Sequence, residues 1–180
     1  IYIKTVYISP MPVKSNSAET RLRDTAYVDC DVHPSYEKEE IVEYLPENYR
    51  NQQGYNLPQG MWTNPELGFL EEPIAIDSGT SDVTPEQLAA DVFEDAESAI
   101  LNPDGILLLS TSPQINYAPV LARAYNDWFI DNWLDYDDRF VGSMIVAPQR
   151  PQKAAEEIRR IGDHQQIKQV IMGSATESPY

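Results

Sequence analysis

The chain has 180 residues, of which 42% are hydrophobic, and this length and composition predict one globular domain with its own core. Its 29 acidic residues outnumber 13 basic ones and give a formal net charge of −16. Such a charge argues against nucleic acid or an anionic membrane surface as a partner, because both require a basic footprint. The acids are spread along the whole chain, which indicates a halophile-type surface, with an ordinary acidic cytosolic protein as the alternative.

Cysteine usage and hydropathy indicate the compartment. The single cysteine, Cys30, cannot form an internal disulfide, so an oxidising compartment has no support and we expect a cytoplasmic protein. No apolar run approaches the roughly 20 residues that a membrane span needs. Residues 1–25 are interpreted as a tail. Because Met11 opens a polar stretch typical of a natural N-terminus, residues 1–10 are interpreted as upstream read-through.

Periodicity and turn residues predict an alternation of strands and helices. The strands are expected at 26–32, 98–101, 139–147 and 167–172. The helices are expected at 37–45, 85–98, 117–134 and 151–162. Residues 47–82 are predicted to be a long irregular insertion, and 106–109 a strand or a loop. The order of these elements predicts an α/β fold with parallel strands joined by right-handed crossovers.

The first strand carries the sharpest chemical pattern. Because side chains alternate along a strand, Asp29, Asp31 and His33 are expected on one face and Val28, Cys30 and Val32 on the other. A carboxylate and an imidazole two residues apart can bind Zn²⁺, Mn²⁺ or Fe²⁺, and a metal with an open position activates water. The alternative is a histidine satisfied by its neighbouring acid. The place of the pair at a strand's carboxyl end favours a ligand site.

Other polar residues are interpreted as structural. His164 follows a helix and precedes a strand, on the face away from such a site. The hydroxyls of 110–112 follow an apolar run but lack a Gly-x-Ser-x-Gly elbow, so a serine hydrolase has no support. Asp127, Asp131 and Asp135 repeat every four residues and are interpreted as a solvated acidic helix face.

Together these motifs resemble the amidohydrolase-related family, in particular the branch that includes aminocarboxymuconate-semialdehyde decarboxylase and the aromatic acid decarboxylases. The resemblance covers residues 26–173. The matching blocks are Val28-Asp29-Cys30-Asp31-Val32-His33-Pro34, Glu43-Tyr44-Leu45-Pro46, Leu121-Ala122-Arg123-Ala124-Tyr125-Asn126-Asp127-Trp128, Asp138-Arg139-Phe140-Val141-Gly142-Ser143 and Pro148-Gln149-Arg150-Pro151.

The resemblance implies a metal-dependent (β/α)8 barrel whose first strand ends in a metal-binding pair. His33 matches the invariable histidine of that pair and Asp31 its variable partner, where histidine or glutamate is more familiar. Asp29 matches an upstream acid that is usually not a ligand, and Cys30 is expected to pack under helices. Further ligands, a histidine after the fifth strand and an aspartate after the eighth, have no counterpart in residues 1–180. We therefore expect the N-terminal portion of a barrel, with about four parallel strands.

The resulting hypothesis is a metal-dependent enzyme that hydrolyses or decarboxylates a small carboxylic or aromatic substrate. Asp31 and His33 are the expected metal ligands, Zn²⁺ is the expected metal with Mn²⁺ or Fe²⁺ as alternatives, and Trp62 in the insertion is the expected substrate contact. The fragment 26–180 by itself is expected to be inactive, and assembly into a homo-oligomer is left open. The alternative from another class is a metal-free α/β binding or scaffold module in which Asp31 and His33 form a structural pair.

Overall fold

The computed structural model describes residues 27–36, 38–50, 83–103, 105–112 and 114–173. The predicted tail, the start at Met11 and most of the insertion, including Trp62, lie outside these residues. The first part of the insertion is not irregular, because α3 (Glu47–Arg50) follows α2 (Lys38–Tyr44) directly after Pro46. The backbone N–H groups of Tyr49 and Arg50 both donate to the carbonyl of Pro46, which explains the extra turn.

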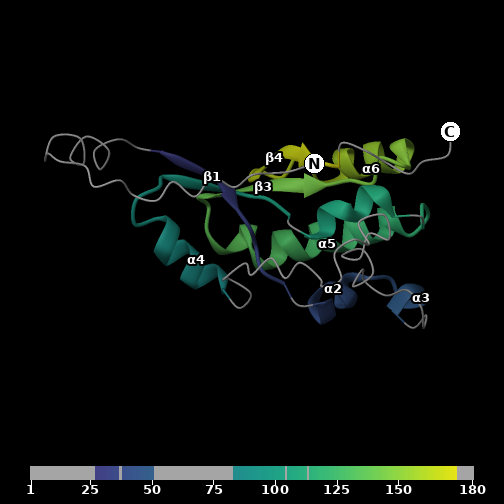
Figure 1. Ribbon diagram of the computed structural model, residues 1–180, viewed down its shortest axis with the longest axis horizontal. Coiled ribbons are helices and arrows are strands. Elements are labelled where there is room, and N and C mark those ends of the chain that lie inside the picture. Colours follow the sequence, from purple (N-terminus) through teal and green to yellow (C-terminus); the bar gives the residue numbers. More distant parts are fainter. Residues whose placement is uncertain (1–26, 37, 51–82, 104, 113, 174–180) are drawn as a thin grey trace, which may run out of the picture.

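Four parallel strands form one sheet, as the alternation of elements predicts. The strands are β1 (Val28–Val32), β2 (Ser98–Leu101), β3 (Phe140–Ile145) and β4 (Ile167–Ile171). They pair in chain order, so β1 and β4 are the two edges of the described sheet. Since each pair is parallel, all four carboxyl ends point the same way (Figure 1).

The helices begin where proline and capping residues predict. A capping box opens α4 (Pro85–Val92), where the Thr84 hydroxyl accepts the Gln87 N–H and the Gln87 side chain accepts the Thr84 N–H. Helix α4 ends six residues earlier than expected, since the chain must turn before β2 begins at Ser98. Proline also opens the first turn of α5 (Ala118–Asn132) and α6 (Pro151–Ile161).

The apolar run after β2 is neither strand nor loop. It forms the 3-10 helix η2 (Gly105–Thr111). Side chains three residues apart share a face of such a helix, and Ile106 and Leu109 are both buried in the core. Continuous hydrophobicity over four residues did not reveal that three-residue spacing, which is why the sequence left the run ambiguous.

The core lies between the sheet and α5. Tyr125, Trp128 and Phe129 of α5 are almost fully buried, and the ring of Tyr36 meets both Tyr125 and Trp128 edge-on. A Cβ at Gly142 would approach the Leu134 side chain to 2.7 Å, in the 3-10 helix η3 (Leu134–Tyr136) that follows α5. Glycine at this position of β3 therefore allows the strand to pack closely against α5 and η3.

The prediction that Cys30 packs under helices is wrong, because Cys30 is exposed. The pairing of β1 with β2 shifts register between Asp29 and Val32, and this irregularity interrupts the strict alternation of faces. Strand β1 is also an edge of the described sheet, and Val28 on the same strand is exposed too. Only Val32 of the expected inward set is buried.

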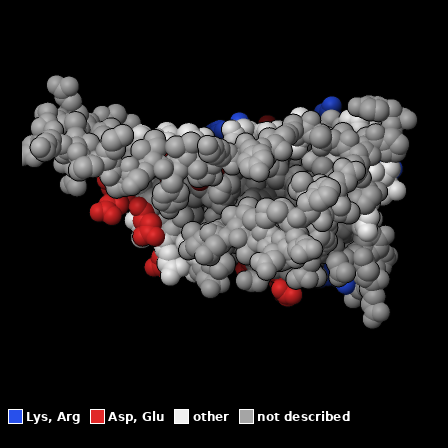
Figure 2. Space-filling view, viewed as in Figure 1, with Lys and Arg blue, Asp and Glu red and all other residues white. Residues whose placement is uncertain are grey.

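The largest group of visible acidic side chains lies on the side of the molecule where Figure 1 draws α4 (Figure 2). Helix α4 and the following turn expose Glu86, Asp91, Glu94 and Asp95. Among the described helices, none has the length and apolar character that crossing a membrane would require.

Candidate active site

The structure brings Asp31 and His33 together at the carboxyl end of β1. His33 Nε2 lies 3.3 Å from Asp31 Oδ1, and both side chains are accessible to solvent. Asp29 takes another role, because its Oδ1 accepts the backbone N–H of Asp31 at 3.1 Å. Asp29 thus supports the local backbone.

The second ring nitrogen of His33 is held by the neighbouring strand. His33 Nδ1 lies 3.0 Å from the backbone carbonyl oxygen of Asn102, the residue directly after β2. A carbonyl oxygen can only accept a hydrogen bond, so Nδ1 carries the proton. In the neutral ring, Nε2 therefore carries a lone pair and no hydrogen, 3.3 Å from Asp31 Oδ1.

This arrangement fits a bound cation. Two electron-pair donors, an imidazole nitrogen and a carboxylate oxygen, face each other with no hydrogen between them in the neutral ring. A proton or a metal ion between the two atoms would stabilise both, and imidazole with carboxylate suits Zn²⁺, Mn²⁺ or Fe²⁺. The fixed Nδ1–H is also the second-shell bond that metal-binding histidines usually have.

Two ligands alone do not complete a metal centre. Within the described part of the chain, no group of three or more His, Cys, Asp or Glu side chains is placed to hold a metal ion. Asp31 and His33 thus provide half of a typical four-ligand shell. Their assignment as ligands stays a prediction.

A polar row crosses the sheet beside this pair and was missed by the sequence reasoning. Its members after His33 are Asn102, Ser143 of β3 and Gln169 of β4. Ser143 Oγ donates to Asn102 Oδ1 at 2.6 Å, and Gln169 Nε2 lies 2.6 Å from Ser143 Oγ and 3.2 Å from Asn102 Oδ1. The available signal was a polar residue that interrupts or ends each apolar strand.

His164 lies at the opposite, amino end of the sheet, as expected for a structural residue. Its Nδ1 accepts the backbone N–H of Gln166 at 3.3 Å, and its Nε2 lies 3.8 Å from Asp135 Oδ1. The hydroxyls of Ser110, within η2, and Ser112, directly after it, have local roles as well. Ser110 Oγ donates to the Leu107 carbonyl, and Ser112 Oγ accepts the Gln114 N–H.

The three regularly spaced aspartates of α5 and η3 are not simply a solvated face. Asp127 pairs with Arg160 at 2.7 Å, and Asp131 accepts the Tyr44 hydroxyl at 3.1 Å. Burial, together with Asp131, raises the pKa of Tyr44 above its usual value, although the Asn132 amide opposes this change. With Asp135 beside His164, each acid connects α5 or η3 to a neighbouring element.

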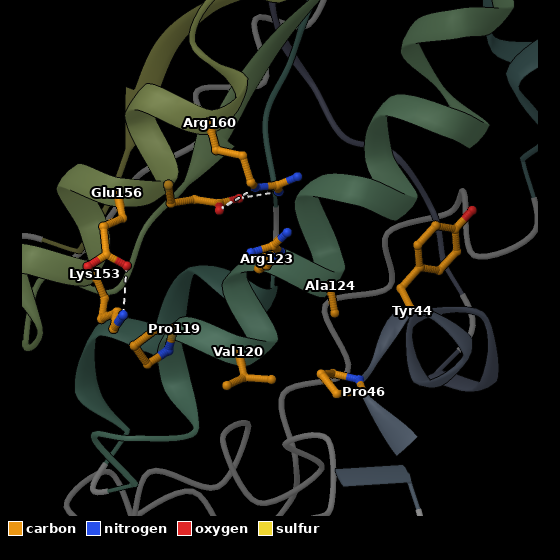
Figure 3. Close-up of a pocket in the computed structure, with 10 residues that line it drawn as sticks. Tyr44, Pro46, Pro119, Val120, Arg123, Ala124, Lys153, Glu156 and Arg160 are labelled. Carbon is orange, nitrogen blue, oxygen red and sulfur yellow. Dashed lines mark hydrogen bonds and ion pairs between the residues drawn. The ribbon is translucent and has the colours of Figure 1, made fainter. Parts of the chain in front are cut away.

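A cavity of about 470 Å³ lies in the helix layer, between α5, α6 and the end of α2 (Figure 3). Its charged lining residues all take part in ion pairs: Arg160 with Glu157 and with Asp127, Arg123 with Asp127, and Lys153 with Glu156. It lies on the helices and not at the carboxyl ends of the strands, where α/β enzymes bind their ligands. We therefore place the candidate site at Asp31 and His33.

Comparison with known proteins identifies the family. The family model described as Amidohydrolase matches residues 28–177, which begin with β1 and include all four strands. No curated protein matches the chain. The family is one of hydrolase-type enzymes that typically use divalent metals, and four parallel strands with flanking helices are what part of its barrel would contain. The chain belongs to the amidohydrolase family.

Proposed function

We propose that this protein is a metal-dependent enzyme in which Asp31 and His33 hold a divalent cation, Zn²⁺ first and Mn²⁺ or Fe²⁺ as alternatives. The observation that carries the proposal is the 3.3 Å approach of His33 Nε2 to Asp31 Oδ1 while the Asn102 carbonyl holds Nδ1. A metal bound at this position would polarise a substrate carbonyl or carboxylate, or activate water.

The chain's own groups have distinct roles in this proposal. His33 provides a neutral nitrogen donor whose proton is held on the far side of the ring. Asp31 provides a negatively charged oxygen donor that balances part of the cation's charge. The remaining ligands and the general base would come from residues other than those the structure describes here.

The proposed substrate is a small carboxylic or aromatic compound, which is either hydrolysed or decarboxylated. Hydrolysis is suggested by the family. Decarboxylation is suggested by the resemblance to the decarboxylase branch in blocks such as Asp138–Ser143. Trp62 is proposed as a substrate contact on sequence grounds alone. The single cysteine supports a cytoplasmic location in the same proposal.

Metal analysis of purified protein tests this function. The unchanged protein, His33→Ala and His164→Ala would be dialysed against trace Zn²⁺ and analysed by mass spectrometry for bound metal. His164 is a matched control, because it is the second of the chain's two histidines and also lies beside an aspartate. We expect metal in the unchanged protein and in His164→Ala, and a large loss in His33→Ala.

Negligible metal in all three proteins would overturn the proposal. That outcome would favour the metal-free module, in which Asp31 and His33 form a structural pair. Equal metal in all three would mean that other residues bind the ion, and it would contradict the assignment of His33.

A further inference from the structure

Asn102 connects three strands of the sheet through one side chain. Its Nδ2 donates to the carbonyl of Cys30 in β1 at 3.0 Å. Its Oδ1 accepts the Ser143 hydroxyl of β3 at 2.6 Å and the Gln169 amide of β4 at 3.2 Å. No part of this network belongs to the backbone ladder of the sheet.

The backbone of the same residue holds the histidine. The Asn102 N–H donates to the Val32 carbonyl at 2.8 Å, and the Asn102 carbonyl accepts from His33 Nδ1 at 3.0 Å. The position of that carbonyl is therefore set from both sides: by β1 through the backbone, and by β3 and β4 through the side chain.

The network becomes more buried away from His33. His33 is exposed, Asn102 is half-buried and Ser143 is fully buried. Ser143 uses its hydroxyl twice, since it donates to Asn102 and accepts from Gln169 at 2.6 Å. A fully buried hydroxyl with both partners in place is a rigid support for the exposed end.

We propose that Asn102, supported by Ser143 and Gln169, is a positioning residue that keeps the proton of His33 on Nδ1 and so leaves Nε2 free to bind a cation. This inference rests on the proposed metal function for its purpose, but the proton position can be measured without a metal. Outer partners of this kind typically change metal affinity by about 10–100-fold when removed.

The test is a long-range ¹H–¹⁵N spectrum of the two imidazole rings in metal-free protein, recorded at increasing pH until the ring nitrogen shifts no longer change. The unchanged protein is expected to show the His33 proton on Nδ1. The His164 proton is expected on Nε2, because its Nδ1 accepts the Gln166 N–H. His164 thus serves as an internal reference in every spectrum.

Asn102→Ala is expected to give a mixture of both His33 tautomers, with His164 unchanged, and about 10–100-fold weaker Zn²⁺ binding. Asn132→Ala is the matched control, because it also removes an amide that links elements: Asn132 Nδ2 donates to the Tyr44 hydroxyl and the Trp128 carbonyl. The control should leave both rings and Zn²⁺ affinity unchanged. Should Asn102→Ala fail to fold, Ser143→Ala removes one bond of the network and is expected to shift the tautomers in the same direction.

An unchanged Nδ1–H tautomer in both the Asn102 and Ser143 variants would overturn the positioning role. So would an Nε2–H tautomer in the unchanged protein. A tautomer that depends on Asn102 in a protein that binds no Zn²⁺ would support the positioning role while contradicting the metal function. Zn²⁺ binding through His33, with a His33 tautomer that does not depend on Asn102, would support the metal function and contradict the positioning role.

Discussion

The chain contains two histidines, each beside an aspartate, at opposite ends of one sheet. At the amino end, His164 Nδ1 accepts the backbone N–H of Gln166, so the neutral ring carries its hydrogen on Nε2, 3.8 Å from Asp135 Oδ1. At the carboxyl end, His33 Nδ1 donates to the backbone carbonyl of Asn102, so in the neutral ring Nε2 carries no hydrogen and lies 3.3 Å from Asp31 Oδ1. The same two residue types thus place a hydrogen on the nitrogen nearer the carboxylate at one end of the sheet and leave it without one at the other.

The difference comes from the backbone partner of Nδ1 and not from the aspartate. A backbone N–H leaves the neutral ring able to donate to a carboxylate, whereas a backbone carbonyl removes that ability. This contrast explains why one histidine is interpreted as structural and the other as a ligand. It also shows which substitutions should distinguish the two ends.

The largest expected effect follows from Asp31→Asn. An Asn amide can donate to His33 Nε2, so the metal-free fold should keep its stability. Zn²⁺ affinity should fall on the order of 100-fold, which is the upper end of the loss seen when a residue that only supports a ligand is removed. Titration calorimetry and thermal unfolding of metal-free protein measure the two quantities. The control is Asp135→Asn, which should leave Zn²⁺ affinity unchanged. A fall in the stability of metal-free Asp31→Asn would contradict the idea that the pair lacks a hydrogen.

Gln166→Ala should be the strongest stability change at the amino end. The Gln166 amide Nε2 lies within 3.1 Å of three carbonyl oxygens, those of Leu134, Asp137 and Phe140. Removing it leaves partly buried acceptors without that donor, at a cost of about 1–3 kcal/mol. Denaturant unfolding measures this cost. Reduced Zn²⁺ binding in the same variant would contradict the separation of the two ends.

A smaller, pH-dependent effect is expected from Asp137→Asn. Hydrogen bonds from the Arg139 side chain hold the pKa of Asp137 below its ordinary value, although burial opposes this. The carboxylate therefore stabilises the fold above the ordinary pKa of 3.8, and this contribution is lost as the pH falls through the lower folded value. The melting temperature of Asp137→Asn should be lower at pH 7 and approach that of the unchanged protein toward pH 2. A constant difference at all pH values would contradict this linkage.

The smallest effect is expected from salt, and it concerns the whole surface. With a net charge of −16, molar KCl should screen repulsion among acids such as those on α4 and raise the melting temperature by a few degrees. Unchanged and His164→Ala proteins should respond equally. Melting temperatures that do not rise in molar KCl would count against the proposed halophile-type surface.

The order of strands and helices could be predicted from the sequence because it depends on residues that are close together in the chain. Each helix start is indicated by a proline in the first turn of α4, α5 or α6, and each strand by a continuous apolar run. Both signals consist of residues that are neighbours in the chain, and their order predicts a parallel α/β sheet. The exposure of Cys30 could not be predicted in the same way, because it depends on a register shift between two strands 70 residues apart.

The same limit applies to the candidate site. Asp31 and His33 are two residues apart on one strand, and their proximity follows from strand geometry. The role of Asn102 could not be predicted in this way, because its partners Ser143 and Gln169 approach it only through the pairing of distant strands. No local pattern states which ring nitrogen of His33 meets a carbonyl.

The most direct test is the location of the ion. Crystals of the protein soaked in Zn²⁺, measured at the zinc absorption edge, should show an anomalous peak about 2.0–2.2 Å from both His33 Nε2 and an Asp31 carboxylate oxygen. The His33 Nδ1 should remain bonded to the Asn102 carbonyl in the same map. A fully soaked crystal without a peak at this pair, or with the peak at His164 and Asp135 instead, would contradict the account.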